Sequence, residues 1–240
     1  MEISARIDGR DVPRDEVLAW ESKRAEKVAK KLGVVALGSG LPVLRQTLVE
    51  RKLALGHDGI ERLLSSQLRL SETFTRLTAS ASRWRRRLSS IELNSRQGAA
   101  EMIPQWYADT AAGGDEAPLL AACPDHYLLR TRADRRPEVI ETTGGAPMPI
   151  RMFFDESDLS TLTTSSDSAF PVEWAGVARN GRGAPIGGIR HQFRDREGGG
   201  FHVRLTVEFP GLTAPAMVNA HRWHLACEFS NWIETANGDT

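Results

Sequence analysis

The sequence predicts an α+β protein, in which an N-terminal helical region precedes an antiparallel sheet curved around a long C-terminal helix. Through the first ninety or so residues, apolar side chains recur at spacings of three and four, the period of a helix. After Pro124 the pattern changes to short runs of extended character separated by turn signals. A last segment, from about Pro215 to Glu234, is helical again.

Composition limits the possible functions. With 240 residues, 40% of them hydrophobic, the chain has enough apolar material for one large domain or two small ones. Lys+Arg and Asp+Glu both number 31, so no overall field attracts nucleic acid or an anionic membrane. No run approaches the roughly 18 apolar residues of a membrane span, and the N-terminus has no signal-peptide pattern. We therefore expect a cytoplasmic protein with neither partner.

The two cysteines, Cys123 and Cys227, are too few for a disulfide framework. We expect both to be reduced and to lie beside the functional site as small apolar neighbours. Ligation of a metal by their thiolates is the alternative.

Three helices are expected in the N-terminal half. The first spans about residues 13 to 32 and ends at Gly33, the second spans about 42 to 55 and ends at Gly56, and the third opens at Asp58. The third carries a seam of alternating three- and four-residue spacings, formed by Ile60, Leu63, Gln67, Leu70, Phe74, Leu77, Ala81, Trp84, Leu88 and Ile91. Such a seam predicts a coiled coil, and hence a homodimer. The alternative is that the stripe packs on the first two helices of its own chain.

Small and polar residues from about 98 to 117 read as a loop, and the domain boundary is placed there. Residues 1–115 would then form a helical oligomerisation region, and residues 116–240 a catalytic or ligand-binding domain.

Six strands are expected in the second half. They are His126–Arg132, Glu138–Thr143, Ile150–Phe154, Val172–Arg179, Ile186–Arg194 and Phe201–Phe209. The last alternates strictly between apolar and polar residues, as a strand with one buried face does. Short turns between the runs indicate hairpins, so the sheet should be mostly antiparallel, with a cavity between it and the C-terminal helix.

The C-terminal helix carries a candidate metal-binding pair, His224 and Glu228. They are four residues apart, so an imidazole nitrogen and a carboxylate oxygen come within reach of one divalent ion. The alternative for this pair alone is a solvated surface pair or a hydrogen-bonded core histidine. His221 shares the same helix face, and its role is left open.

Two further ligand candidates lie on the first two predicted strands. A tight turn near residues 133–136 would pair these strands antiparallel, with opposed residues whose numbers add up to about 267 or 269. His126 and Glu141 meet this condition. They should face each other at the distance that two ligands of one metal need.

These segments resemble the zinc-dependent diacetylphloroglucinol and phloretin hydrolases. The resemblance lies in His224-Leu-Ala-Cys-Glu-Phe-Ser-Asn231, Cys-Pro-Asp-His126-Tyr, Val139-Ile-Glu141-Thr-Thr-Gly-Gly-Ala-Pro147 and Ile189-Arg-His191-Gln-Phe. The segments occur in the family's order and cover about residues 122 to 234. The interval between the first His and the first Glu is shorter here, and an asparagine expected after the first His is Leu129, which affects substrate identity more than metal binding.

The resemblance implies a Zn²⁺ site formed by His126, Glu141, His224 and Glu228, on a helix-grip (birch-allergen-like) domain. It also implies hydrolysis of a carbon-carbon bond beside a ketone in an acylated phenolic or polyketide-like compound. The zinc would lower the pKa of water toward about 7 and polarise the ketone, so that hydroxide attacks the acyl carbon. An acid must then protonate the departing ring carbon.

His191 is the predicted acid, because the alternation of its strand places it with Ile189 and Phe193 on the apolar, inward face. The alternative is a core histidine bonded to backbone. His57 and His202 are expected at the surface.

Two other functions stay open at this stage. A metal-free binding or cyclase-like protein of the same shape would use the cavity alone. An oligomeric scaffold would act through the helical half.

Overall fold

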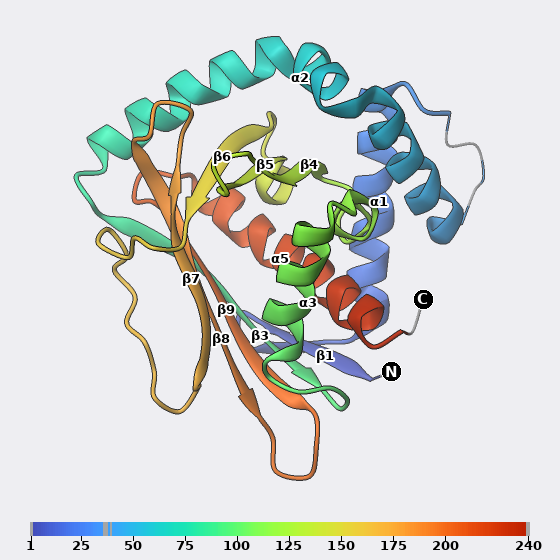
Figure 1. The fold of residues 1–240 in the computed structure, drawn as a ribbon, viewed down its shortest axis with the longest axis vertical. Helices are drawn as coiled ribbons and strands as arrows, with labels where there is room; N and C mark the ends of the chain where they lie inside the picture. Colours follow the sequence, from blue (N-terminus) through green and yellow to red (C-terminus); the bar gives the residue numbers. More distant parts are fainter. Residues whose placement is uncertain (1, 36–37, 39, 239–240) are drawn as a thin grey trace.

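The computed structural model describes residues 2–35, 38 and 40–238, and within them the protein is α+β. One antiparallel sheet of nine strands has the order β2-β1-β3-β9-β8-β7-β6-β5-β4 (Figure 1). The strands are β1 (Ile3–Ile7), β2 (Arg10–Val12), β3 (Arg86–Ser95), β4 (His126–Thr131), β5 (Pro137–Glu141), β6 (Ile150–Asp155), β7 (Val172–Arg179), β8 (Pro185–Asp195) and β9 (Phe201–Pro210).

All six predicted strands are present as β4 to β9, with ends that differ by no more than two residues. Their agreement has a simple cause. Each run is bounded by residues that favour turns, and neighbours along the chain pair as antiparallel neighbours in the sheet. Local signals were therefore sufficient to define these strands.

The helices are α1 (Arg14–Leu32), α2 (Leu41–Ala81), α3 (Met102–Gly113), α4 (Glu116–Ala121) and α5 (Pro215–Ala236), with a 3₁₀ turn, η1, at Thr143–Gly145. The end of α1 at Gly33 is as predicted, since this glycine has the left-handed φ of 67° that closes helices. The predicted break at Gly56 appears as a bend within α2, where φ is 61° and ψ is 177°.

The third helix is shorter than predicted. It ends at Ala81, and the backbone turns through Arg83 and Trp84, which both have positive φ. Leu88 and Ile91, assigned to the helical seam, instead belong to β3, which pairs with β9 along ten residue pairs. The spacing of three between Leu88 and Ile91 fits a helix, and in a strand it places the two side chains on opposite faces. Leu88 is accordingly 40% exposed, whereas Ile91 is buried.

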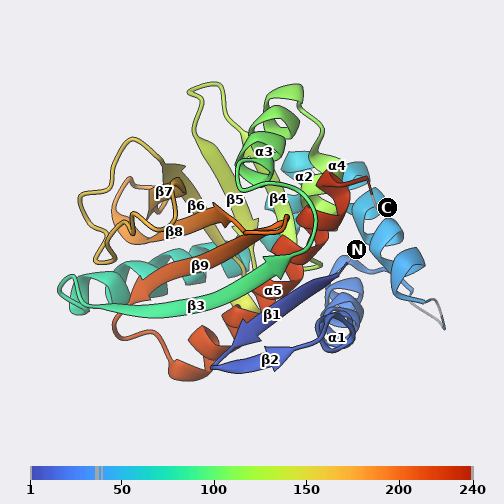
Figure 2. The same cartoon turned by 90° about the horizontal axis from the view of Figure 1, so that it is seen from below.

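The predicted division at residue 115 is also corrected. Strands β1, β2 and β3 come from the first 95 residues, yet they continue the same sheet as β4 to β9 (Figure 2). The segment expected to be a loop, 98–117, contains α3 and the start of α4. The N-terminal half is therefore not a separate helical region, because its strands and helices share the core of the second half.

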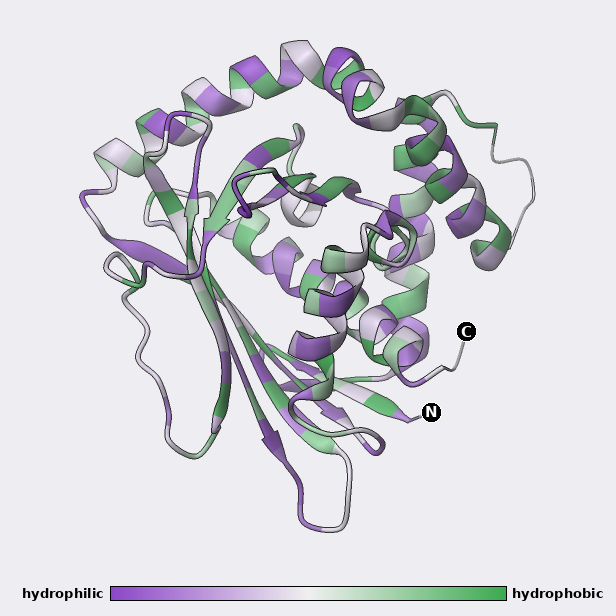
Figure 3. Ribbon diagram, in the orientation of Figure 1, coloured by the Kyte–Doolittle hydropathy of each residue, from purple (hydrophilic) through white to green (hydrophobic). Residues whose placement is uncertain are grey.

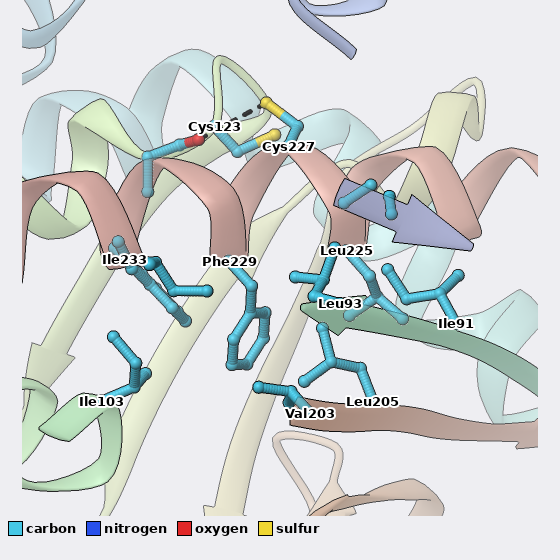
Figure 4. Close-up of a cluster of buried hydrophobic side chains, with 14 of the residues drawn as sticks. Ile91, Leu93, Ile103, Cys123, Val203, Leu205, Leu225, Cys227, Phe229 and Ile233 are labelled. Carbon is cyan, nitrogen blue, oxygen red and sulfur yellow. Dashed lines mark hydrogen bonds between the residues drawn. The ribbon is translucent and has the colours of Figure 1, made fainter. Parts of the chain in front are cut away.

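Helix α5 lies at the centre of that core. Leu225, Phe229 and Ile233 on α5 pack with apolar residues of β3 and β9, including Leu93 and Leu205 (Figure 4). This contact fixes the helix against the sheet, so that the remaining face of α5 is available for polar groups. Within the described part of the chain, no helix is both long enough and apolar enough to cross a membrane.

Candidate metal centre

Two histidines and two glutamates from three elements converge on one point. The Nε2 atoms of His126 and His224 are 3.2 Å apart. Glu228 Oε1 is 3.4 Å from His126 Nε2, and Glu141 Oε2 is 3.8 Å from it. His224 Nε2 lies 3.7 Å from Glu141 Oε2 and 3.9 Å from Glu228 Oε2. The four residues proposed from the sequence are thus brought together.

The pairing of β4 with β5 accounts for half of this arrangement. His126 and Glu141 are direct partners in the register, as predicted, and a β-bulge follows His126. The bulge locally re-aims side chains, a frequent feature beside functional sites.

Gly144 brings the end of β5 against α5. Its φ is 52°, and a Cβ built there would lie 2.2 Å from the backbone N and Cα of His221. Only glycine allows this backbone to approach the helix so closely. The Thr-Gly-Gly turn therefore sets the distance between Glu141 on the sheet and the histidines on α5.

The orientation of His126 suits a ligand. Its Nδ1 lies 3.1 Å from the carbonyl oxygen of Leu119. A carbonyl only accepts, so Nδ1 carries a proton and donates, and in the neutral ring Nε2 presents a lone pair to the cluster. Two imidazole nitrogens and two carboxyl groups facing one point form a donor set that divalent transition metals bind.

Cys123 and His221 surround His224. Cys123 Sγ is 3.6 Å from His224 Nδ1, and the His221 ring is stacked on the His224 ring with centroids 5.2 Å apart. Among the residues that the structure describes, two buried sets of three side chains could hold a metal ion. One set is Cys123, His126 and His224, and the other is Glu141, His221 and His224. Burial raises the pKa of the Cys123 thiol to about 11, which favours its protonated form.

Burial also decides the charges of the cluster. It raises the pKa of Glu141 to about 8, and the neighbouring Glu228 adds to the effect. Burial alone would lower the pKa of His126. The hydrogen bond to Glu228 and the charge of that carboxylate outweigh burial, so the pKa of His126 is raised. For His224, burial and then the charge of His126 lower the pKa well below its usual value. Without a cation Glu141 therefore keeps its proton at neutral pH, and a positive charge bound beside it would favour its ionised form.

Ion pairs hold the segment that carries His126. Arg24 of α1 donates two hydrogen bonds to the buried Asp125 carboxylate, at 2.7 and 2.5 Å. Lys52 of α2 is buried and donates to the Pro124 carbonyl at 3.0 Å. Both N-terminal helices therefore fix the position of the first candidate ligand.

A cavity of about 300 Å³ opens onto the cluster. Glu141, His221 and Glu228 line it, and most of the remaining lining is apolar or aromatic. Tyr107, Trp174 and Trp232 form one wall, with the Tyr107 ring centroid 4.6 Å from that of Trp174 and 5.3 Å from that of Trp232. This volume lies at the small end of the range for ligand pockets.

His191 is buried on the face of the sheet toward α5. Its ring contacts those of Trp174 and Phe229 edge-on, and its Nδ1 accepts a hydrogen bond from the Thr206 N–H at 3.3 Å. Burial lowers its pKa to about 3. His191 is not one of the described residues that line the cavity. To donate a proton to a substrate in the cavity, its ring would have to reach past Trp174 and Phe229.

The other two histidines are less exposed than predicted. The His57 side chain is 38% exposed, and its Nε2 lies 2.6 Å from Glu116. The His202 side chain is 12% exposed and lies 3.4 Å from Glu92. Neither is near the cluster.

Sequence reasoning missed Tyr107, because the segment containing it was taken for a loop. A helical spacing was present, since Ile103, Trp106 and Tyr107 lie three and four residues apart. The surrounding alanines and glycines obscured it. Its phenol has a raised pKa because of burial, and then because of the Glu228, Glu156 and Glu141 carboxylates. The group therefore stays protonated and available as a donor.

Comparison of the chain with models of protein families finds none that matches, and a search of curated proteins finds no matching relative. The resemblance within residues 122–234 therefore rests on the residues themselves.

Proposed function

We propose that this protein is a zinc-dependent hydrolase that cleaves the carbon-carbon bond between a ketone and a phenolic or polyketide-like ring, on a helix-grip domain. One observation carries the proposal. His126, Glu141, His224 and Glu228, chosen from sequence spacing and resemblance, meet within 3.2 to 3.9 Å. Glu141 and Glu228 also line the cavity.

These four residues would hold the ion through two imidazole nitrogens and carboxylate oxygens. A zinc ion bound there supplies Lewis acidity, which makes water a better nucleophile and polarises a ketone oxygen. Hydrolysis adds the elements of water across the bond. The hydroxyl goes to the acyl carbon, giving a carboxylic acid, and the proton goes to the ring carbon, which keeps the bonding electrons.

Tyr107 is our candidate for delivering or guiding that proton. It lines the cavity, and its rotation is restricted by contact with Trp174 and Trp232. A protonated phenol donates a hydrogen bond to a substrate oxygen and so favours the keto form of the ring. His191 is the alternative donor, and the two are separated by mutation below.

The test is metal content together with turnover. Protein purified without added metal should contain one zinc per chain by elemental analysis and should release acetate from acetylphloroglucinol. A chelator should remove both properties, and zinc should restore them. Metal-free protein, or zinc-loaded protein that cleaves no acylated phenol, would contradict the proposal.

A metal-free small-molecule binding protein is the second candidate. It is favoured by the largely apolar lining of the cavity. It is also favoured by the raised pKa of His126, since a proton there can supply the positive charge that the carboxylates need. Ligand binding that is unchanged after complete zinc removal, without any hydrolysis, would identify it.

A further inference from the structure

The cavity is long and extends along α5. Met217, Glu228 and Trp232 all line it. With a rise of 1.5 Å per residue, Met217 and Trp232 are separated by about 22 Å along the helix axis. Glu228 lies about 6 Å from Trp232 and about 16 Å from Met217 on the same axis. The candidate metal centre is therefore off-centre, close to the end of the cavity that contains Trp232.

The short end is aromatic and offers polar contacts. Trp174 donates its indole N–H to Glu156 at 2.8 Å, which fixes the plane of the ring. Trp232 is buried, and its Nε1 has no hydrogen-bond partner among the described residues. A buried donor left unpaired is uncommon, and a bound ligand oxygen is one explanation. This end suits a flat ring that bears oxygen.

The long end is mostly aliphatic, with Phe154 and Phe209 among its lining residues. Phe154 pairs with Ala178, and Ala178 pairs with Gly187, so these residues lie level with one another across β6, β7 and β8. Phe209, from the next strand, and Met217, from α5, also line the cavity. Most of this lining favours hydrocarbon. The Glu208 carboxylate, which also lines the cavity, is bonded to the Thr163 and Thr164 N–H groups.

Helix α2 covers this end. The N–H of Leu212, in the segment that leads to α5, donates to Ser82 Oγ at 3.1 Å, so the end of α2 is tied down there. Thr78, one turn before Ser82, lines the cavity. In Figure 1 the second half of α2 passes over β6 and the ends of β7 and β8, and α2 packs on β6 and β8.

We infer that the substrate is an elongated aryl ketone whose hydrocarbon acyl chain extends from the metal centre toward Met217 and the C-terminal part of α2. The orientation of the ketone rests on the function proposed above, whereas the length of the cavity does not. A short acyl group such as acetyl would leave the aliphatic end unfilled.

The test uses acetyl-, butanoyl-, hexanoyl- and octanoylphloroglucinol with chelator-treated protein, which is not expected to hydrolyse them, and measures binding by calorimetry. Affinity should rise about fourfold for each added methylene until the end is full, as expected for burial of hydrocarbon. Thr78→Phe projects a ring into the aliphatic end and should abolish this increase while leaving acetylphloroglucinol binding unchanged.

Thr73→Phe is the matched control. Thr73 is an exposed threonine of the same helix whose hydroxyl makes the same kind of bond, to the carbonyl four residues before it, as that of Thr78. It should keep the full dependence on chain length. Ala178→Leu, which fills the same end from β7, is a second variant in case Thr78→Phe does not fold.

Equal affinity of the unsubstituted protein for all four ketones would overturn the inference. It would also be overturned if affinity still increased with acyl-chain length in both Thr78→Phe and Ala178→Leu. The readout is binding and needs no turnover. Absence of hydrolysis would therefore contradict the proposed function alone, and a normal increase in affinity would still support the long aliphatic end.

Discussion

The Nε2 atoms of His126 and His224 lie 3.2 Å apart, although one residue begins a strand and the other lies in the middle of α5. This separation fits a hydrogen bond in which one of the two nitrogens carries the proton, and it also allows both nitrogens to bind one cation. Each loss of a carboxylate or imidazole from this cluster should therefore affect cation binding first.

We expect His224→Ala and Glu228→Ala each to abolish zinc retention while helical content is unchanged, because a lost ligand removes binding free energy but little core. Elemental analysis and circular dichroism would measure the two effects. The control is Glu234→Ala on the same helix, whose carboxylate bonds to Arg14 instead. Full zinc and full activity in both ligand variants would mean that the site is wrongly assigned.

The proton donor can be identified by paired substitutions. Tyr107→Phe retains the ring contacts with the two tryptophans and removes only the hydroxyl, so zinc should be kept and turnover should fall by roughly 100-fold. His191→Gln should also keep zinc, with turnover changed only a few-fold. The opposite pattern would assign the catalytic role to His191, as predicted from the sequence, and loss of zinc in His191→Gln would make it a ligand.

Gly144→Ala should lower both stability and zinc affinity. The added Cβ meets the backbone of His221 at 2.2 Å, and a positive φ costs alanine about 1 kcal/mol or more. Gly183→Ala is the matched control, because Gly183 has a φ of 79° with open space around it. Thermal unfolding and a competitive zinc titration would compare them. Equal losses in the two variants would show that strain, and not the close approach, is responsible.

Acid should destabilise the fold through buried histidines. Burial lowers the pKa of His191 and of His221 to about 3, whereas the pKa in the unfolded chain is about 6.5. Between pH 6.5 and pH 3 the unfolded chain therefore binds more protons than the folded protein. The stabilisation that comes from the neutral buried histidines is complete above about pH 6.5 and is lost as the pH falls. The loss between pH 6.5 and pH 5 is about 1.5 kcal/mol per histidine. His191→Gln should reduce this pH dependence in denaturant titrations, and an unchanged slope would argue against a buried neutral His191.

The prediction of a homodimer remains to be tested. Within the predicted seam, the second half of α2 is the part that could form the interface. Leu70, Phe74 and Leu77 are 59%, 57% and 59% exposed, so this part of the stripe does not pack on the first two helices of its own chain. Figure 3 shows hydrophobic residues alternating with hydrophilic ones along this helix. If it mediates a dimer, Leu77→Glu should give monomers by light scattering, and Ser80→Glu, at another exposed position, should not. A stable dimer in Leu77→Glu would place any interface elsewhere.

The sequence by itself determined the strands β4 to β9, the helix α5 and the register that places His126 opposite Glu141. These features depend on interactions between near neighbours, namely alternation along a strand, short turns and the helical period. The resemblance to zinc hydrolases selected the same four residues, and each is a member of one of these locally encoded elements.

Only the tertiary structure decided how β3 pairs and where the cavity lies. The three-residue spacing of Leu88 and Ile91 fits a helical seam, but the ladder with β9, more than a hundred residues away, places both residues in a strand. The distance from Glu141 to α5 depends on the contact of Gly144 with the His221 backbone. Tyr107 reaches the cavity because α3 packs against Trp174 and Trp232. Such contacts depend on packing between distant segments, and no local pattern encodes them.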